Sequence, residues 1–171
     1  MSFPEALAFT LSVEGGWYDG SGSHDPNPTM KGVTQKTYDG FRQRKNLPLR
    51  SVKEIEQWEL ESIYRSYWEA VDGDSLPPKT GAAVFDMAVN AGPLASLKVL
   101  QRALGVVADG IVGPQTRQAL TAVEDSLLAH KVNVERLKFY VKITRSNPKL
   151  RPALLSWVSR VTGFADRFLS S

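Results

Sequence analysis

Apolar residues at helical spacing, separated by proline- and glycine-containing breaks, constrain the fold of this chain more than any other feature. One apolar stripe, with residues three and four positions apart, consists of Leu60, Ile63, Tyr64, Tyr67 and Val71. Helices are expected at about residues 3–14, 35–45, 94–104, 124–145 and 152–169, and others from the capping box at residues 51–54, from Pro77-Pro78 and from Pro114. The sequence therefore predicts a mostly helical protein.

The segment between Gly15 and Gly32 does not follow this helical pattern. It contains five glycines and two prolines together with Asp and Ser, a composition typical of turns. Trp17 and Tyr18 offer apolar area that anchors such a loop to a core. We expect an ordered loop with at most two very short strands, and long ordered loops in compact domains are usually functional.

Glu14 stands at the end of the first expected helix. Phe3, Leu7 and Leu11 precede it at spacings of four, four and three, so Glu14 is expected on the same face as these core residues. Gly15 and Gly16 are expected to end the helix in the left-handed conformation. An inward carboxyl group at the C-terminal end of a helix lies near negative dipole charge and partly out of water. Both effects favour its protonated form, which a general acid needs. The alternative is an exposed glutamate at a helix end.

Composition excludes several classes of protein. The chain has 171 residues, no Cys, and only His24 and His130 as histidines, so neither disulfides nor a zinc site is expected. No stretch approaches the length of a membrane span, and no secretory signal is visible at the N-terminus. Seven of the 21 Lys and Arg fall between Lys131 and Arg151, with Glu135 as the one acid. This cluster is either a solvated helix face or a surface that attracts an anionic polymer.

Three motifs near the N-terminus resemble those of glycoside hydrolase family 108, the bacterial and phage N-acetylmuramidases. The matching motifs are Glu14-Gly15-Gly16, Asp25-Pro26-Asn27-Pro28-Thr29 and Gly32-Val33-Thr34. Asn27-Pro28 replaces the glycine pair of the family pattern, and the spacing from Glu14 to Asp25 is about two residues longer. The resemblance implies an α+β, lysozyme-like layout: one helical domain with an irregular catalytic loop or a small β-hairpin near its N-terminus.

Later blocks of the sequence also resemble this family. Asp86 and Asn90, four residues apart, share a helix face, and the run Tyr64-Arg65-Ser66-Tyr67-Trp68 matches the family's Tyr-x-x-Tyr-Trp. The segment with Asp109-Gly110 resembles a peptidoglycan-binding region, although tight-turn geometry explains the same residues. We therefore expect a muramidase catalytic part in residues 1–92 and a helical peptidoglycan-binding part in residues 93–171, packed as one globular unit.

The resemblance implies a hydrolase that cleaves the β-1,4 bond between N-acetylmuramic acid and N-acetylglucosamine. Glu14 would be the general acid, Asp25 the second carboxylate, and Thr29 the residue that positions water. Asp19 is the alternative second carboxylate, and Thr34 the alternative to Thr29. The expected substrate-binding residues are Trp17, Tyr18, Thr34, Tyr67, Trp68, Asp86 and Asn90. For the aromatic residues on the helix, and for Asp86, core packing or a supporting role is the more frequent reading.

The same sequence is compatible with three other functions. A chitinase-like glycosidase or a lytic transglycosylase would use the same residues, and a non-catalytic peptidoglycan-binding module would use none of them chemically. The expected partner is the peptidoglycan glycan strand. Neither a cofactor, a metal, nucleic acid nor stable membrane insertion is expected. We expect a monomer that is made in the cytoplasm and acts on the bacterial cell wall after release through a pore or a secretion system.

Overall fold

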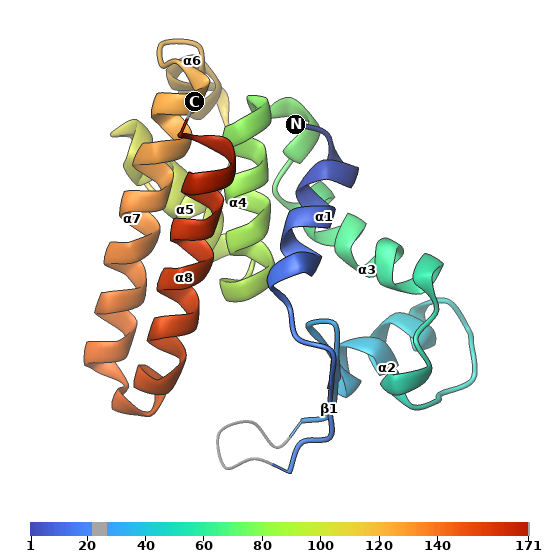
Figure 1. The fold of residues 1–171 in the computed structure, drawn as a ribbon. Coiled ribbons are helices and arrows are strands. Elements are labelled where there is room, and N and C mark those ends of the chain that lie inside the picture. Colours follow the sequence, from blue (N-terminus) through green and yellow to red (C-terminus); the bar gives the residue numbers. More distant parts are fainter. Residues whose placement is uncertain (22–26, 171) are drawn as a thin grey trace. The chain divides into compact units, whose positions relative to one another are not determined.

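The computed structural model describes residues 1–21 and 27–170, and this part of the chain is mostly helical, as predicted (Figure 1). The α-helices are α1 (Phe3–Val13), α2 (Gln35–Arg44), α3 (Gln57–Ala70), α4 (Pro78–Ala91), α5 (Pro93–Leu104), α6 (Pro114–Leu120), α7 (Asp125–Ser146) and α8 (Arg151–Phe168). Single 3₁₀ turns are η1 (Val52–Glu54), η2 (Gly73–Ser75) and η3 (Pro148–Leu150). The expected helix positions agree closely with these bounds, except at the start of α3.

The chain forms two compact units that do not divide at residue 92. One unit is Leu7–Ser66, and the other combines Met1–Ala6 with Tyr67–Ser171. Helices α1 and α3 pass from one unit into the other. The division into a catalytic and a wall-binding part, which was expected from sequence resemblance, concerns function and stays a prediction.

The unit Leu7–Ser66 contains a small antiparallel sheet with strand order β1-β2-β3. Its strands are β1 (Trp17–Tyr18), β2 (Thr29–Met30) and β3 (Val33–Thr34), so the loop forms one strand more than we expected. Lys31 and Gly32 connect β2 to β3 as a two-residue turn, and both have positive φ, at 47° and 77°. A two-residue turn with two positive φ angles matches the twist of a β-hairpin. The small hairpin predicted near the N-terminus is therefore present.

Helix α3 begins at Gln57, six residues after the Ser51 capping box that predicted its start. The Ser51 hydroxyl accepts from the Lys53 N–H and caps only the short turn η1. The residue before α3, Glu56, donates its backbone N–H to the carboxylate of Glu59 at 3.0 Å. In a capping box, the side chain of the third helical residue accepts a hydrogen bond from the backbone N–H of the N-cap residue. Glu59 and Glu56 form this bond, so this pair, and not Ser51, sets the start of α3.

Glu59 is fully buried and is held by two arginines and a tyrosine. Arg42 pairs with one of its oxygens, while Arg50 donates to the other at 2.7 Å. The Tyr38 hydroxyl also donates to Glu59, at 2.7 Å. Burial would raise the pKa of this carboxyl, but these hydrogen bonds and charges outweigh burial and hold the pKa below its usual value. The cluster ties α2 and the following loop to the start of α3.

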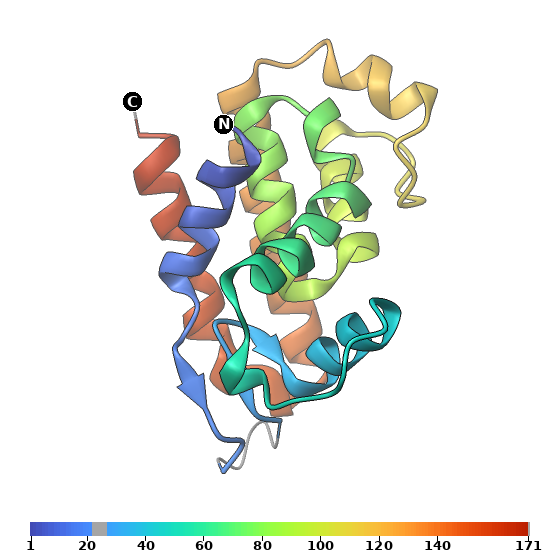
Figure 2. The same cartoon turned by 90° about the vertical axis from the view of Figure 1, so that its right-hand side faces the viewer.

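The second unit is built mainly from α4, α5, α7 and α8. Helix α4 contacts α5 and α7, and α8 returns along α7 (Figures 1 and 2). The core positions of α4 include Ala83, Val84, Phe85, Met87 and Ala88, none of which is exposed. A helix that is apolar on nearly all sides is typical of the centre of a bundle.

Asp86 lies in this core and forms buried ion pairs with α7 and α8. Its carboxylate lies 2.7 Å from Arg136 Nη2 and 2.8 Å from Arg160 Nη2. Burial would raise the pKa of Asp86, but the two guanidinium groups outweigh it and hold the pKa below its usual range. A buried carboxylate with two arginine partners fixes three helices at one point, at the expense of removing all three charges from water.

The turn after α5 explains the Asp109-Gly110 motif. The side chain of Gln101, only 1% exposed, donates to Asp109 at 2.6 Å and accepts from the backbone N–H of Gly110 at 2.7 Å. Gly105 ends α5 with a φ of 73°, the left-handed cap that glycine favours. These contacts account for the motif by turn geometry alone.

Asp86→Asn tests the buried ion pairs. Since the variant leaves two guanidinium groups without a charged partner, we expect a loss of about 3–5 kcal/mol in the free energy of unfolding, measured with urea. Asp72→Asn is the matched control, because Asp72 and its partner Arg117 are largely exposed. That change should cost less than about 1 kcal/mol. Equal losses would contradict this assignment.

The same carboxyl gives the unit a pH dependence. The folded pKa of Asp86 lies below its unfolded value, so its contribution is complete above the unfolded value of about 4 and is lost as the pH falls through the folded value. We expect the stability difference between the parent and Asp86→Asn to shrink as the pH falls below about 4. A difference that stays constant from pH 7 to pH 2 would contradict the expectation.

Candidate functional site

Glu14 follows the last residue of α1 and is half-buried. The expected reason for the helix end is wrong, because neither Gly15 nor Gly16 has a positive φ. A Cβ atom at either glycine would meet nothing within 4 Å. The glycine pair therefore borders open space and does not provide a left-handed cap.

The carboxyl group of Glu14 lies against the tip of the β2–β3 hairpin. A Cβ atom at Gly32 would lie 2.7 Å from Glu14 Oε2 and 2.6 Å from the Tyr64 hydroxyl. Real Cβ atoms do not approach other atoms this closely, so only glycine leaves room for both groups. The positive φ of Gly32 favours glycine independently. The turn thus brings the Glu14 carboxyl group and the Tyr64 hydroxyl together at the position that a side chain of residue 32 would fill.

Two hydrogen bonds fix the hairpin tip in this place. The Tyr64 hydroxyl, from α3, donates to the backbone carbonyl of Lys31 at 2.7 Å. The backbone N–H of Lys31 donates to the carbonyl of Gly16 at 3.3 Å, which joins the tip to the residues that follow Glu14. Sequence reasoning placed Tyr64 in an apolar stripe and missed this role. The sequence signal for the hairpin, on which this contact depends, was the Lys31-Gly32 pair between two short β-type segments.

The sheet separates its side chains onto two faces. Tyr18 pairs with Thr29, and Thr29 pairs with Thr34, so these three residues share one face. Trp17, Met30 and Val33 form the other row. The predicted residues Tyr18, Thr29 and Thr34 are therefore brought together, while Trp17 lies on the opposite face.

The hydroxyl groups of the two threonines are already engaged. Thr29 Oγ1 donates to the carbonyl of Asn27 at 3.0 Å, and Thr34 Oγ1 accepts from the Thr37 N–H as the cap of α2. Thr34, of the residue type favoured at a helix N-cap, is thus the N-cap of α2. Trp17 keeps 40% of its surface exposed, and the Lys53 ammonium lies 5.6 Å from its ring centroid. The Trp17 ring therefore offers an accessible apolar surface on the sheet.

Of the two candidates for the second carboxylate, one is described. Asp25 lies outside the described residues. Asp19 lies just after β1 and is exposed, and its carboxylate accepts from the Ser21 N–H at 2.9 Å. Hydrogen bonds from Ser21 lower the pKa of Asp19, so this carboxyl stays ionised near neutral pH.

Trp68 belongs to the core and not to a binding surface. Only 2% of it is exposed, its ring packs edge-on against Phe3 and Phe85, and its Nε1 donates to Asp74 at 2.8 Å. The expectation that it stacks on a sugar is corrected by this burial. Tyr67, next to it, is half-buried.

Asp86 is connected to Asn90 by a chain of hydrogen bonds through Arg136 and Tyr140. Its partner Arg136 donates from Nε to the Tyr140 hydroxyl at 2.9 Å, and that hydroxyl donates to Asn90 Oδ1 at 3.0 Å. Asp86 is itself 1% exposed, so the expectation that it contacts substrate directly is corrected. Asn90 is half-buried, and among the described residues its Nδ2 group has no hydrogen-bond acceptor. The network therefore holds Asn90 with a donor group available.

Within the described part of the chain, no group of three or more His, Asp or Glu side chains is placed to hold a metal ion. In the same residues, no helix has both the length and the apolar character needed to cross a membrane.

Gly32→Ala tests the packing at the hairpin tip. Because a methyl group here meets Glu14 and Tyr64 and the backbone is left-handed, we expect a loss of about 2 kcal/mol or more in the free energy of unfolding. Gly16→Ala is the matched control, since its Cβ meets nothing within 4 Å and its φ is not positive. It should change stability by less than about 0.5 kcal/mol. A Gly32→Ala protein as stable as the Gly16→Ala protein would contradict this geometry.

Comparison with known proteins assigns both parts of the chain. Residues 7–92 match the family model described as glycosyl hydrolase 108. Residues 95–162 match a model described as a predicted peptidoglycan domain. Among curated proteins, none matches the sequence.

A solved structure, that of Brucella abortus SagA, is similar over nearly the whole length. The two sequences are 30% identical, the match covers 99% of this chain and 96% of that chain, and the TM-score is 0.77. Since one family model covers half of the chain and this relative spans almost all of it, the chain belongs to the glycosyl hydrolase 108 family and is a glycoside hydrolase that acts on peptidoglycan.

Proposed function

We propose that the protein is an N-acetylmuramidase with Glu14 as its general acid. It would cleave the β-1,4 bond between N-acetylmuramic acid and N-acetylglucosamine. The observation that carries this proposal is the packing of the Glu14 carboxyl, half-buried, against Gly32 and beside the Tyr64 hydroxyl. A half-buried carboxyl group held beside a phenol hydroxyl is of the type that acts as a general acid toward a sugar oxygen.

In this mechanism Glu14 gives its proton to the glycosidic oxygen as the bond from that oxygen to the anomeric carbon breaks. Positive charge then develops on the sugar ring, and a second carboxylate either attacks the anomeric carbon or takes a proton from an attacking water. We assign that second role to Asp25. Thr29 would position the attacking water: its Oγ1 donates to the Asn27 carbonyl, so its lone pairs can accept a hydrogen bond from that water, while the proton goes to the carboxylate.

Trp17 and Tyr18, on opposite faces of the same small sheet, are proposed to contact different parts of the glycan strand. The Trp17 ring is 40% exposed and offers a flat apolar face of the kind that stacks on a pyranose. Tyr18 lies in the same sheet row as Thr29. Tyr67 and Asn90, in the other compact unit, stay predictions from the sequence. Asn90 Nδ2 is suited to an N-acetyl carbonyl, because Tyr140 already occupies its Oδ1.

Glu14→Gln tests the general acid. The amide keeps the shape of the side chain but has no acidic proton to give, so we expect turnover of purified sacculi to fall by at least about a hundredfold. The free energy of unfolding should change little. Glu61→Gln is the matched control, because Glu61 is an exposed residue of α3 bonded only to Gln57 among the described residues. It should keep parent activity. Near-parent turnover by Glu14→Gln would remove Glu14 from the acid role.

Asp25→Asn and Asp19→Asn, assayed side by side on the same sacculi, identify the second carboxylate. We expect Asp25→Asn to lower turnover at least tenfold more than Asp19→Asn does, because Asp19 is exposed and bonded to its neighbour Ser21. The reverse order would move the role to Asp19.

Mass spectrometry of the released fragments separates the remaining reactions. Hydrolysis at N-acetylmuramic acid gives a reducing end on that sugar, whereas a lytic transglycosylase leaves an anhydro sugar. Faster cleavage of chitin oligomers than of sacculi would assign the site to a chitinase-like reaction. Binding to sacculi without any release of fragments would leave only a wall-binding protein.

A further inference from the structure

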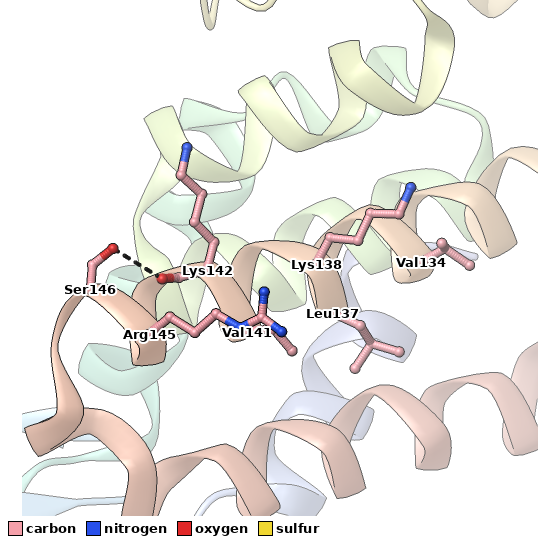
Figure 3. Close-up of a pocket in the computed structure, with 7 residues that line it drawn as sticks. All are labelled: Val134, Leu137, Lys138, Val141, Lys142, Arg145 and Ser146. Carbon is pink, nitrogen blue, oxygen red and sulfur yellow. Dashed lines mark hydrogen bonds between the residues drawn. The ribbon is translucent and has the colours of Figure 1, made fainter.

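Helix α7 carries a groove with an apolar floor and a basic rim on the surface of the unit that contains Tyr67–Ser171. The groove has a volume of about 530 Å³. Val134, Leu137 and Val141 form its floor, and Lys138, Lys142 and Arg145 form its rim. Figure 3 shows Lys138 and Lys142 extending on one side of the helix and Leu137 on the other, with Arg145 lying along the helix toward Val141. We call this surface the α7 groove.

The apolar floor is exposed although the opposite face of α7 is fully used for packing. Val134 and Val141 keep 40% and 37% of their surface exposed. Val132, Arg136 and Tyr140, on the other face of the helix, are completely buried. The exposed apolar stripe therefore lies on a face that the core does not need.

The basic rim is largely without acidic partners. Lys138 pairs with Glu135 at 2.7 Å, but among the described residues neither Lys142 nor Arg145 has an ion-pair partner. A second hollow of about 250 Å³ lies beside the first, shares Lys138 and Lys142 with it, and adds Arg102 from α5. The two hollows thus place four cations and one acid around a stretch of exposed apolar surface.

We propose that the α7 groove binds the peptide stem of peptidoglycan. The stem is a short peptide whose free carboxylates suit Lys138, Lys142 and Arg145, and whose alanine methyl groups suit the floor of Val134 and Val141. The assignment rests on the proposed action on peptidoglycan. It goes beyond that function because it gives the glycan strand and its peptide separate binding surfaces, with Glu14 acting on the sugar.

Two other anionic partners fit the groove less well. A membrane surface is bound by a helix face rich in large apolar or aromatic side chains, but the floor of the α7 groove has two valines, one leucine and no aromatic residue. Single-stranded nucleic acid is bound by several aromatic platforms on which successive bases stack, whereas no aromatic residue lines the α7 groove and Phe139 alone lines the second hollow. A small peptide with several carboxylates agrees with the charge of the rim and with the small apolar side chains of the floor.

The test compares two triple variants in the Glu14→Gln protein, so that the probe is not consumed. Lys138→Ala/Lys142→Ala/Arg145→Ala removes the rim. Lys131→Ala/Lys149→Ala/Arg151→Ala removes the same charge from exposed positions of the same region and is the matched control. The probes are a purified disaccharide with its tripeptide stem and the same disaccharide without the peptide. Binding is followed by NMR titration of the Val134 and Val141 methyl groups and by calorimetry.

We expect the peptide-bearing probe to shift the Val134 and Val141 resonances, with an affinity about tenfold weaker in the rim variant and unchanged in the control variant. Affinity should fall with added salt more steeply in the control than in the rim variant. The peptide-free disaccharide should leave both methyl resonances in place.

Three results would overturn the proposal. The first is equal affinity of the two triple variants for the peptide-bearing probe. The second is equal shifts with the peptide-free disaccharide, which would make the groove a sugar site. The third is binding to phosphatidylglycerol vesicles that is lost only in the rim variant, with the peptide-bearing probe unaffected. None of these readouts needs catalysis, so failure of Glu14 as the acid, seen as fragment release by Glu14→Gln, is a separate result.

Discussion

The packing of Glu14 and Tyr64 at the position where Gly32 lacks a side chain is the constraint on which the site depends. Neither group reaches this position unless the hairpin residue lacks a side chain, and the hairpin closes only if that residue accepts a positive φ. One glycine therefore satisfies a steric and a backbone requirement at once. The hydrogen bond from Tyr64 to Lys31 then makes α3 the support of the hairpin tip. The site is held by residues that are not themselves chemically reactive.

Each compact unit is organised around one buried carboxylate with two arginines. In the unit with the sheet, Glu59 binds Arg42 and Arg50 and also caps α3. In the other, Asp86 binds Arg136 and Arg160 and reaches Asn90 through Tyr140. Such clusters add little net stability relative to an apolar core, but they allow few alternative arrangements. They give each unit a defined geometry around residues proposed to act on the glycan.

Local signals in the sequence predicted much of the fold. The expected helices at about 35–45 and 94–104 and the helix start at Pro114 each depend on a few neighbouring residues, and they agree with α2, α5 and α6 of the structure. The start of α3 was wrong because two capping signals stand close together and only long-range contacts favour the second. Glu59 is drawn to that role by Arg42, which is 17 residues away in the chain. The spacing of Tyr67 and Trp68 also could not show that Trp68 is buried in the core while Tyr67 stays partly exposed.

For the candidate site, the sequence could identify Glu14, but not what faces it. Its carboxyl is adjacent to Gly32 because a hairpin folds back, and the partner Tyr64 comes from a helix 33 residues beyond Lys31. In the same way, the partners of Asp86 lie 50 and 74 residues away, so its burial could not be read from its neighbours. Residue type and spacing identify a reactive group, whereas tertiary contacts decide its surroundings.

The buried cluster of Asp86, Arg136 and Arg160 also has a consequence for how related sequences can diverge. Losing the acid leaves two cations in the core, and losing one arginine leaves the buried carboxylate with a single guanidinium partner. The three positions are therefore epistatic, and a lineage can replace the cluster with apolar residues only by crossing less stable intermediates. Such triads should be inherited or lost together, which makes their joint presence a marker of common descent among distant homologues.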